Sequence, residues 1–393
     1  MPREIKGNIP KCALKYFPRE CINLKVNKLS GIKEKSFSDL MKEVITPGLC
    51  PVCGTCIAVC PYNALILREE SFKRSELHEL EITRDIYKSI EDLCEQCGFC
   101  YYNCPEIMFS LEKAEEEEFG TVAKDELGHV QKAYMAQAAD KKILKNAQCG
   151  GVATALLKYT MENELVDAAV GVTSTEHPGW KPKPTVITEP KDLHKFQKTK
   201  YTPAATVIGV TSALYERVRS KIAVVATPCQ VRGIWTTNIS PKGYSKIFQS
   251  IKLIIGLFCY GTYSYNDLFV KFLTKKHGIT PLSVNKIDLD TEKMRVYVNN
   301  ELKLEVHRHQ LHKYLRKSCS DCRDFTNRLA DVSLGGVGSP EKWTTVLIRT
   351  ERGKKTFENA VNEGYVKAKP LSDRGLEKVK GLARLKLKEG ITD

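Results

Sequence analysis

Two copies of one cysteine pattern constrain this sequence more than any other feature. Each copy reads C-x2-C-x2-C-x3-C-P, and together they supply Cys50, Cys53, Cys56, Cys60, Cys94, Cys97, Cys100 and Cys104. This spacing is typical of chains that bind two [4Fe–4S] clusters, in which three close cysteines hold one cubane and the cysteine before the proline holds the other. The pattern therefore predicts crossed ligation, with one cluster on Cys50, Cys53, Cys56 and Cys104 and the second on Cys94, Cys97, Cys100 and Cys60.

Zinc is the main alternative for paired C-x2-C motifs. A structural zinc site needs four ligands and no trailing Cys-Pro, so the double pattern favours iron–sulfur clusters. The segment between the copies, residues 61–93, is longer than in a minimal two-cluster domain, and we interpret Ile82–Ile90 as an inserted helix. Cys12 and Cys21 precede the pattern with a spacing that suits no common cluster, which favours free thiols.

The composition points to metal binding inside a reducing compartment. The chain has 15 cysteines, most of them in ligand-like spacings, and its N-terminus lacks the apolar stretch of a secretion signal. It also lacks the long apolar run of a transmembrane helix, so we expect a cytoplasmic protein without a membrane span. The net charge of +14 suits an anionic partner. Aromatic and basic residues do not interleave as a nucleic-acid surface requires, so we expect no nucleic-acid partner.

The sequence beyond residue 130 alternates helical and strand patterns. Two apolar runs, Ile222–Ala226 and Ile251–Phe258, predict buried parallel strands that each lead into a helix. Further expected elements are helices at Ala153–Glu164 and Arg352–Glu363, strands at Ala168–Val172, Asp331–Leu334 and Thr344–Arg349, and an antiparallel meander at Val284–Leu289, Met294–Val298 and Leu302–Val306. A loop rich in proline and glycine is expected after Val172. The fold class is therefore α+β with α/β character.

We divide the chain into three parts. Residues 1–120 are expected to form an N-terminal extension with a bacterial-ferredoxin-like domain, residues 121–370 a mixed α/β domain, and residues 371–393 a basic tail. The acidic run Glu115–Glu118 at the first boundary is typical of a solvated linker. Spaced leucines over Arg374–Glu389 predict a solvated helix, and docking to a partner or a membrane surface is the alternative.

Four further cysteines stand where strands end or turn. Cys229 and Cys259 follow the two apolar strands, and Cys319 and Cys322 form a C-x2-C pair in a loop. Four thiolates that converge at one sheet edge would hold a third [4Fe–4S] cluster, but small buried cysteines are also common in protein cores.

A glycine pair marks another candidate site. Gly150 and Gly151 precede a predicted helix, where free backbone N–H groups and the hydroxyl of Thr154 can hold a phosphate. A simple glycine turn is the alternative, and the G-x-G-x-x-G dinucleotide fingerprint is absent. The triad His307, His309 and His312 in the meander could bind a metal, but its setting is typical of a surface strand and turn.

Seven short motifs occur in one order over about residues 146–365. They are Gln148-Cys149-Gly150-Gly151-Val152-Ala153-Thr154, Trp180-Lys181-Pro182, Thr199-Lys200-Tyr201, Thr227-Pro228-Cys229-Gln230, Gly256-Leu257-Phe258-Cys259, Cys319-Ser320-Asp321-Cys322-Arg323-Asp324 and Ala330-Asp331-Val332-Ser333-Leu334-Gly335-Gly336-Val337-Gly338-Ser339-Pro340. Together they resemble the family of beta subunits of coenzyme F420 hydrogenases and dehydrogenases. With the ferredoxin module, the chain looks like the longer members, which include components of deazaflavin dehydrogenases, formate dehydrogenases and sulfite reductases.

The resemblance implies an F420-dependent oxidoreductase whose mixed α/β domain is a flavoprotein. It implies FAD as cofactor, coenzyme F420 as substrate, and a third [4Fe–4S] cluster on Cys229, Cys259, Cys319 and Cys322. The implied FAD-site residues are Gly150, Gly151, Thr154, Lys181, Thr199, Lys200, Tyr201, Gln230, Gly338 and Ser339. Lys200 and Lys181 are the implied catalytic cations, because a positive charge near the ring stabilises reduced flavin. An ordinary surface position is the alternative for either lysine.

The resemblance also implies a place in an electron-transfer complex. A deazaflavin carries electrons as a hydride and a cluster carries them singly, so a flavin belongs between them. The implied partner is a redox subunit, such as one of a hydrogenase, a formate dehydrogenase or a heterodisulfide reductase, or a soluble ferredoxin. The sequence has no motif for nickel–iron, molybdopterin or siroheme chemistry, so the terminal reaction is expected on another chain.

Two alternatives stay open. Cys149 occupies a position where related chains more often carry an acidic or small residue, and a thiol beside a flavin would suit a reductase of the same fold that acts on a thiol or a tetrapyrrole. A tolerated small residue is the simpler interpretation of Cys149. The second alternative is a non-catalytic subunit that carries clusters but no flavin.

Overall fold

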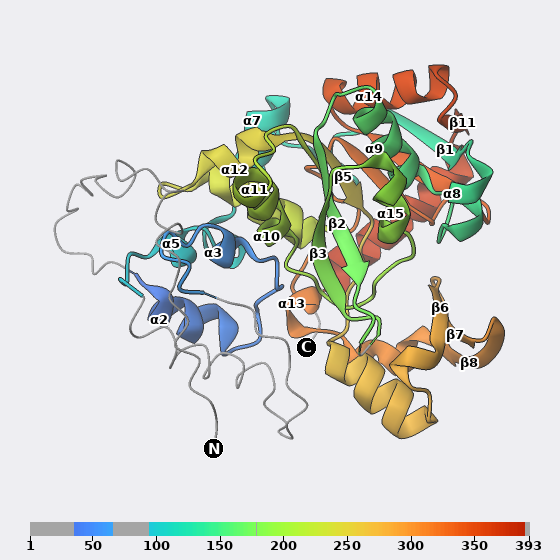
Figure 1. Ribbon diagram of the computed structural model, residues 1–393, viewed down its shortest axis with the longest axis horizontal. Coiled ribbons are helices and arrows are strands. Elements are labelled where there is room, and N and C mark those ends of the chain that lie inside the picture. The colour runs from blue at the N-terminus through green and yellow to red at the C-terminus, as the bar shows by residue number, and fades with distance from the viewer. Residues whose placement is uncertain (1–34, 66–93, 178, 390–393) are drawn as a thin grey trace.

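The computed structural model describes residues 35–65, 94–177 and 179–389 (Figure 1). Cys12, Cys21 and the segment interpreted as an inserted helix, Ile82–Ile90, lie outside the described residues. Within these ranges, no helix combines the length and the apolar character that crossing a bilayer requires.

The largest element is an eight-stranded mixed sheet with the order β11-β1-β10-β9-β5-β4-β2-β3 (Figure 1). Its strands are β1 (Lys132–Ala138), β2 (Ala168–Ser174), β3 (Pro182–Ile187), β4 (Ile222–Ala226), β5 (Ile251–Leu257), β9 (Val332–Gly335), β10 (Thr344–Ile348) and β11 (Val366–Pro370). Strands β2, β4, β5 and β9 are mutually parallel neighbours, and the other pairings are antiparallel. The predicted mixed α/β architecture is confirmed.

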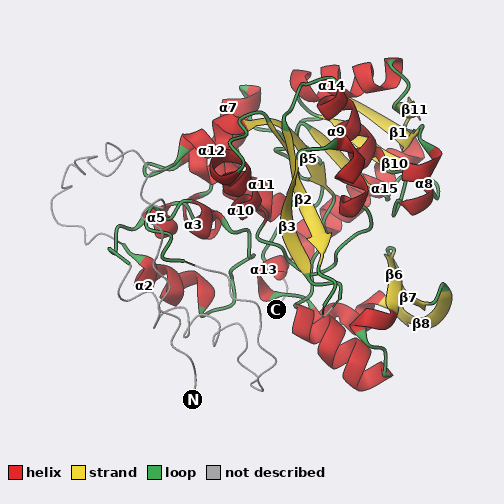
Figure 2. Cartoon of the chain, viewed as in Figure 1, coloured by secondary structure: helices red, strands yellow, loops and turns green. Residues whose placement is uncertain are grey.

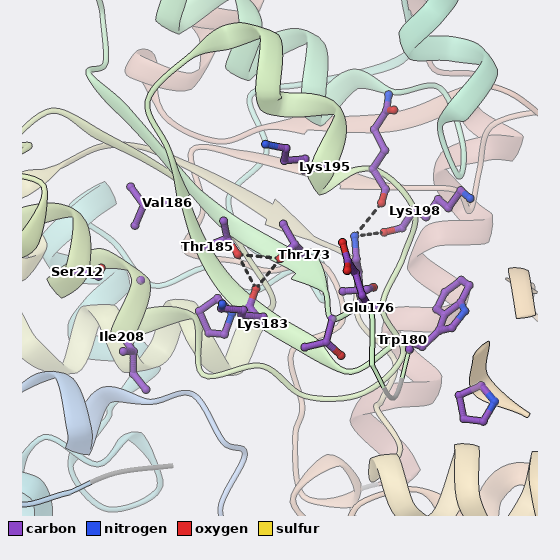
Figure 3. Close-up of a pocket in the computed structure, with 18 of the residues that line it drawn as sticks. Thr173, Glu176, Trp180, Lys183, Thr185, Val186, Lys195, Lys198, Ile208 and Ser212 are labelled. Carbon is purple, nitrogen blue, oxygen red and sulfur yellow. Dashed lines mark hydrogen bonds between the residues drawn. The ribbon is translucent and has the colours of Figure 1, made fainter. Parts of the chain in front are cut away.

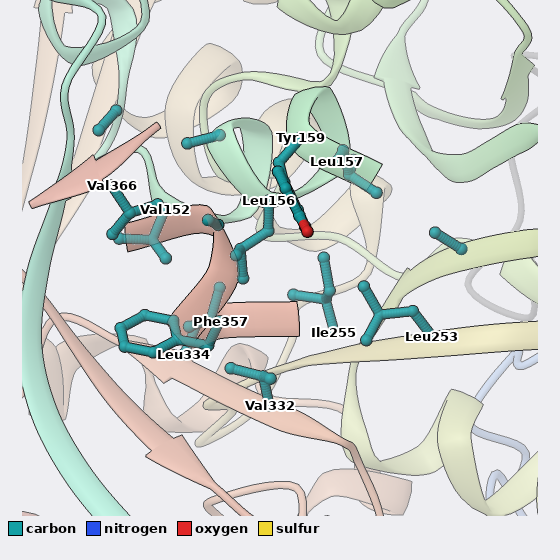
Figure 4. Packing of buried hydrophobic residues seen from close by; sticks show 14 of the residues in the cluster. Val152, Leu156, Leu157, Tyr159, Leu253, Ile255, Val332, Leu334, Phe357 and Val366 are labelled. Atoms are coloured by element: carbon teal, nitrogen blue, oxygen red, sulfur yellow. The ribbon is translucent and has the colours of Figure 1, made fainter. Parts of the chain in front are cut away.

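Helices cover both faces of this sheet. The layer with α8 (Lys141–Asn146), α9 (Val152–Glu162), η3 (Pro190–Phe196) and α14 (Glu351–Asn362) packs on the face that Figure 4 shows. There Leu156 of α9 and Phe357 of α14 meet Ile255 and Val332 of the sheet. The opposite face carries α10 (Thr206–Thr211) with η4 (Ser212–Glu216), α11 (Pro228–Ile239) and α12 (Ser245–Ser250). Because both faces are covered, the central strands β4 and β5 are mostly apolar and buried, as predicted.

A smaller lobe lies apart from the large sheet (Figure 2). It contains the expected meander, β6 (Val284–Leu289), β7 (Lys293–Val298) and β8 (Glu301–His307), together with the helical segments η5 (Asn266–Lys276), η6 (Pro281–Ser283) and η7 (Arg308–Tyr314). Its own core includes Phe269, Phe272 and Ile287. His307, His309 and His312 are exposed, as expected for a surface strand and turn.

The N-terminal module is built from short helices around the paired cysteine motifs. These are α2 (Phe37–Leu40), η2 (Met41–Ile45), α3 (Thr55–Ala58), α5 (Phe99–Tyr102), α6 (Pro105–Met108) and α7 (Leu111–Phe119). In both motifs the residue after the second cysteine is a glycine with a positive φ, 89° at Gly54 and 78° at Gly98, and each begins a helix. A side chain is disfavoured there by the backbone conformation. The repeated motif therefore produces a repeated local structure.

Three sequence interpretations are wrong. The loop expected after Val172 contains β3, which tolerates Pro182 and Pro184 because it is an edge strand. The acidic run is part of helix α7 rather than a solvated linker, and Glu115 is fully buried in an ion pair with Arg328. The C-terminal helix α15 (Asp373–Glu389) is not a solvated tail, because it packs against the body through buried apolar residues: Val379 and Ala383.

Candidate functional site

The eight cysteines of the ferredoxin module fall into two sets of neighbours. The pKa of Cys56 lies well above its usual value, mainly because the thiol is buried. The charges of its neighbours raise the pKa further, and these neighbours are Cys50, Cys53, Cys100 and Cys104. Cys100 has a raised pKa for the same reason, with the neighbours Cys97, Cys60 and Cys94. The structure thus brings the cysteine before each proline next to the close trio of the other motif.

Hydrogen bonds to sulfur recur in this module. The amide of Val52 donates to Cys50 Sγ at 3.4 Å, and the amide of Ala64 donates to Cys60 Sγ at 3.3 Å. The Thr55 hydroxyl lies 3.3 Å from the sulfur of Cys53. Such donors favour a thiolate over a thiol and help to set the potential of a bound cluster.

The four remaining predicted ligands also converge. Cys229 lies in the first turn of α11, Cys259 follows β5, and Cys319 and Cys322 lie in and after α13 (Lys317–Ser320). Burial, followed by the charges of the other three cysteines, raises the pKa of Cys259 well above its usual value. Burial likewise raises the pKa of Cys229 to about 12. We call these residues the C-terminal thiol group: Cys229, Cys259, Cys319 and Cys322.

The donor chemistry of all three groups fits iron–sulfur clusters. Every cysteine within the described ranges is a free thiol. In the same part of the chain, no three His, Cys, Asp or Glu side chains are placed to hold a single metal ion. Groups of four soft sulfur donors, with amide and hydroxyl donors around them, suit a cubane with several iron atoms.

A buried lysine from the C-terminal helix completes the surroundings of the C-terminal thiol group. Lys386 is 4% exposed, and its Nζ donates to the carbonyl oxygens of Tyr260 at 2.6 Å and Cys319 at 2.5 Å. Its charge lowers the pKa of Cys259, against the larger effect of burial. Sequence reasoning missed Lys386, since nothing in a basic tail distinguishes one lysine from its neighbours.

The glycine pair, Gly150 and Gly151, lies at the same edge of the large sheet as the C-terminal thiol group. The amide of Gly150 donates to Thr344 Oγ1 at 2.9 Å, and a Cβ at this position would lie 2.5 Å from the carbonyl oxygen of Ala136. Gly151 begins α9 with a φ of 73°. These positions require glycine for packing and backbone conformation, and Thr154 is buried in the helix that follows.

Cys149 stands among polar residues from three parts of the chain. Burial raises the pKa of its thiol, and the charge of Asp288 adds to the effect. Burial and then Asp288 also raise the pKa of Tyr201, whose hydroxyl has a hydrogen bond with the side chain of Thr199. Gln148 Nε2 donates to Asp288 Oδ1 at 2.6 Å. Sequence reasoning missed Asp288, because the meander in which it lies carries no motif.

The two predicted catalytic lysines differ in their contacts. The Nζ of Lys200 donates to the carbonyl oxygens of Phe196 at 3.1 Å, Gln197 at 2.7 Å and Lys198 at 2.9 Å, at the end of η3. Burial lowers the pKa of Lys200 to about 8. Lys181 lies on the turn between β2 and β3, where its carbonyl oxygen accepts a hydrogen bond from the amide of Thr175.

Lys200 also lines a cavity of about 1000 Å³ beside the β2–β3 hairpin (Figure 3). The cavity walls come from the hairpin, η3, α10 and the start of the smaller lobe. Basic side chains predominate among its charged residues: Lys183, Lys195, Lys198, Lys200 and Arg217, against Glu176 and Glu216. Such a lining suits an anionic ligand of nucleotide size.

Three predicted flavin-site residues have structural contacts that account for their type. Gln230 closes a capping box at the start of α11, and its Nε2 donates to the carbonyl oxygen of Ala204 at 2.7 Å. The hydroxyls of Ser339 and Thr345 lie 2.7 Å apart. A Cβ at Gly338 would lie 2.7 Å from the carbonyl oxygen of Gly375 in α15.

The residues around Cys149 and the C-terminal thiol group are joined through the backbone. The amide of Tyr263 donates to the carbonyl oxygen of Tyr201 at 3.0 Å. The preceding amide, that of Thr262, donates to Cys319 Sγ at 3.3 Å. A ligand beside Tyr201 would therefore lie close to the C-terminal thiol group.

Comparison with known proteins identifies the family. Residues 133–212 and 219–374 match the N-terminal and C-terminal parts of the coenzyme F420 hydrogenase/dehydrogenase beta subunit, and residues 49–108 match a 4Fe-4S dicluster domain. The chain belongs to the family of coenzyme F420 hydrogenase/dehydrogenase beta subunits. The family predicted from the seven motifs is confirmed, and so is a 4Fe–4S module at the N-terminal side.

Individual relatives agree with this assignment. An uncharacterized protein of Methanocaldococcus jannaschii is 33% identical over 90% of this chain and 98% of its own length. One subunit of the F(420)H(2) dehydrogenase of Methanosarcina mazei is 30% identical over 88% of this chain and 91% of its own length. A chain of the F420-reducing [NiFe] hydrogenase complex from Methanosarcina barkeri superimposes with a TM-score of 0.64 and 30% identity, over 69% of this chain and 93% of that chain.

Proposed function

We propose that this chain is a cytoplasmic iron–sulfur flavoprotein subunit that exchanges a hydride between coenzyme F420 and FAD and passes single electrons to a redox partner. The observation that supports the proposal is the hydrogen bond from the amide of Tyr263 to the carbonyl oxygen of Tyr201, next to Thr262, whose amide donates to the Cys319 sulfur; an FAD beside Tyr201 would lie close to the C-terminal thiol group. A two-electron site next to a one-electron site is the arrangement that such an exchange requires.

Three [4Fe–4S] clusters are part of the proposal. The neighbours of Cys56 and Cys100 support crossed ligation in the ferredoxin module, and the mutual proximity of the C-terminal thiol group supports a third cluster. The raised pKa values follow from burial of thiols near each other, and bound iron would offset this cost by stabilising the thiolates. The ligands are the twelve cysteines predicted from the sequence.

The proposed FAD site uses two neighbouring regions. Gly150, Gly151 and Tyr201 belong to the region around Cys149, while Lys200 belongs to the basic cavity. FAD, when bound, supplies the step between paired and single electrons. Backbone amides in the first turn of α9 and the lysines of the cavity would bind phosphate oxygens.

Lys200 is better placed than Lys181 to serve a flavin. Burial holds the Lys200 pKa near 8, so at neutral pH most of the ammonium groups are charged, and an anionic ligand would favour the charge further. Its three carbonyl contacts fix the position of Nζ. We propose Lys200 as a cation that stabilises anionic flavin, and Lys181 as a residue that contacts the ligand from the hairpin.

The partner in this proposal is another redox subunit or a soluble ferredoxin. The solved relative is part of a hydrogenase complex and the Methanosarcina mazei relative belongs to a dehydrogenase, which favours assembly into a complex. In this proposal the chain has three parts. Residues 1–120 pass electrons to the partner, residues 121–370 bind the flavin, and residues 371–393 form a C-terminal segment.

A reductase of the same fold with a thiol substrate is a weaker second candidate. Cys149 lies beside Tyr201, within the implied flavin site. However, burial and Asp288 raise the pKa of Cys149, and a raised pKa disfavours the thiolate that thiol–disulfide chemistry requires.

Anaerobic purification with iron and flavin analysis, followed by reduced coenzyme F420, tests the proposal. We expect about twelve iron atoms and one FAD per chain, with bleaching of the flavin and then of the cluster absorbance. FAD that reduced coenzyme F420 does not bleach would exclude this substrate. Clusters without FAD would favour a non-catalytic electron carrier.

A further inference from the structure

Arg232 occupies a special position on helix α11. It follows Cys229 by three residues, so both side chains lie on one face of the helix. The guanidinium makes an ion pair with Glu106 of α6, with Nη2 3.0 Å from Oε1, and the two side chains are 17% and 18% exposed. Glu106 follows Cys104 by two residues. The ion pair therefore joins a helix of the mixed α/β domain (residues 121–370), which we call the flavin domain after its proposed cofactor, to a helix of the ferredoxin module.

Cysteines flank this ion pair on both sides. On the flavin-domain side, burial lowers the pKa of Arg232. Nearby negative charges outweigh this effect, so the pKa of Arg232 is raised. The largest of these charges is that of Cys322, followed by Glu106 and Cys229. On the ferredoxin side, Glu106 and Arg232 both act on Cys53, with opposite signs. The pair thus lies between the C-terminal thiol group and the first ferredoxin cluster position, on Cys50, Cys53, Cys56 and Cys104.

Helix α11 itself packs tightly against the first cluster position. A Cβ at Gly233 would lie 2.3 Å from Thr55 Oγ1 and 3.2 Å from Cys53 Sγ. One helix therefore supplies Cys229 to one thiol group and lies against Cys53 of the other. Arg232 is not among the main charges that act on Cys97 and Cys100, which belong to the second cluster position.

One donor of Arg232 is left over. Its Nε is buried and has no hydrogen-bond partner within the described residues. Glu106 offsets the charge of the guanidinium but engages Nη2. A buried N–H on a cation, beside thiolates on both sides, is complementary to the negative charge of an iron–sulfur cluster.

We propose that Arg232 is a positioning residue that raises the reduction potentials of the C-terminal cluster and of the first ferredoxin cluster together, and that Glu106 limits this effect. This inference rests on the cluster ligation given under the proposed function. Reduction adds one negative charge to a cluster, and a nearby cation stabilises the reduced form. It follows that electrons pass between the flavin domain and the ferredoxin module at the first cluster, while the second cluster, on Cys60, Cys94, Cys97 and Cys100, faces the partner.

Opposite charge changes at the two partners test the proposal. Redox titrations of the anaerobic full-length protein, followed by electron paramagnetic resonance, would compare Arg232→Gln with Glu106→Gln. Arg232→Gln is expected to lower both potentials by about 59 mV, which for one electron is roughly a tenfold change in the equilibrium constant for reduction. Glu106→Gln is expected to raise the same two potentials. The second ferredoxin cluster should shift in neither variant.

Two further variants separate charge from structural damage. Arg232→Lys keeps the charge and should keep both potentials near those of the wild type, even if Arg232→Gln folds poorly. Arg352→Gln is the matched control, because Arg352 forms an ion pair with the buried Asp331 at 2.7 Å, and no cysteine is among the charges that act on it. This variant should leave all three potentials unchanged.

The outcomes distinguish this inference from the proposed function. A wild-type protein that lacks a third cluster signal would overturn the ligation on which both rest. Three clusters whose potentials are unmoved in Arg232→Gln, or that shift in the same direction in Arg232→Gln and Glu106→Gln, would overturn the role of Arg232 while leaving the proposed function intact.

Discussion

The ferredoxin module and the mixed α/β domain bring cysteines together by different routes. In the module, close motifs and glycines at Gly54 and Gly98 shape the chain locally around the cysteines. In the mixed α/β domain, Cys229 and Cys259 meet because the parallel strands β4 and β5 end at one edge of a sheet. A group of neighbouring thiols can thus be encoded by a short repeat or by the topology of a whole domain, and the second kind depends on packing between distant segments.

Removing one ligand from each region should give the largest effect. We expect Cys100→Ser and Cys259→Ser each to lose about four iron atoms per chain, because a cubane needs its fourth thiolate. Cys100→Ser should keep the spectrum of the C-terminal cluster, and Cys259→Ser that of both ferredoxin clusters. Iron analysis with electron paramagnetic resonance measures this. Loss of all clusters in either variant would show that the regions are not independent.

Removing Lys386 should affect the C-terminal thiol group alone. Lys386→Met leaves the carbonyl oxygens of Tyr260 and Cys319 without this donor, and we expect a loss of about 2–4 kcal/mol in stability. The potential of the C-terminal cluster should fall, and the ferredoxin clusters should not change. Thermal unfolding and redox titration measure the two effects, and Lys388→Met on the same helix is the control. An unchanged melting temperature would contradict the structural role.

The glycines of the flavin domain offer a test of close packing. Gly150→Ala places a Cβ 2.5 Å from the carbonyl oxygen of Ala136, and we expect a loss of about 1–3 kcal/mol in stability together with weaker flavin binding. Gly381→Ala is the matched change, since within the described structure no atom outside its own helix turn lies within 4 Å of the added Cβ. Because Gly381 lies in helix α15, alanine there should stabilise by about 0.5–1 kcal/mol. Flavin content and melting temperature distinguish the two variants. Equal changes in Gly150→Ala and Gly381→Ala would refute the packing argument.

The last expected effect concerns the pH dependence of stability. The pKa of Lys200 is about 8 in the folded chain and near 10.5 in the unfolded chain, so the unfolded chain binds the proton more tightly. This difference in pKa destabilises the folded chain. The destabilisation is complete below pH 8 and is relieved as the pH rises towards 10.5. Without a bound ligand, the wild type should therefore gain about 1–3 kcal/mol over this window relative to Lys200→Met. Melting temperatures of the flavin-free protein at pH 7.5 and 9.5 measure the difference, and parallel pH profiles would contradict it.

Sequence patterns predict those parts of the molecule whose signal is local. The cysteine motifs indicate the module directly, and the apolar runs of β4 and β5 indicate buried parallel strands. Strand β3 was missed because its prolines argue against a strand, although an edge position tolerates them. The docked face of α15 was missed because its leucine spacing alone does not say which surface it covers. Asp288 could not be found, since its role depends on contacts with Gln148 and Tyr201 from distant segments.

The transfer of electrons from the flavin domain to the module is the central claim, and rapid mixing of reduced coenzyme F420 with wild type and Cys259→Ser tests it most directly. We predict that the wild type loses flavin absorbance and then ferredoxin-cluster absorbance. In Cys259→Ser the flavin should still be bleached while the ferredoxin clusters stay oxidised. Equal bleaching of the ferredoxin clusters in both proteins would contradict the account, because electrons would then bypass the C-terminal thiol group.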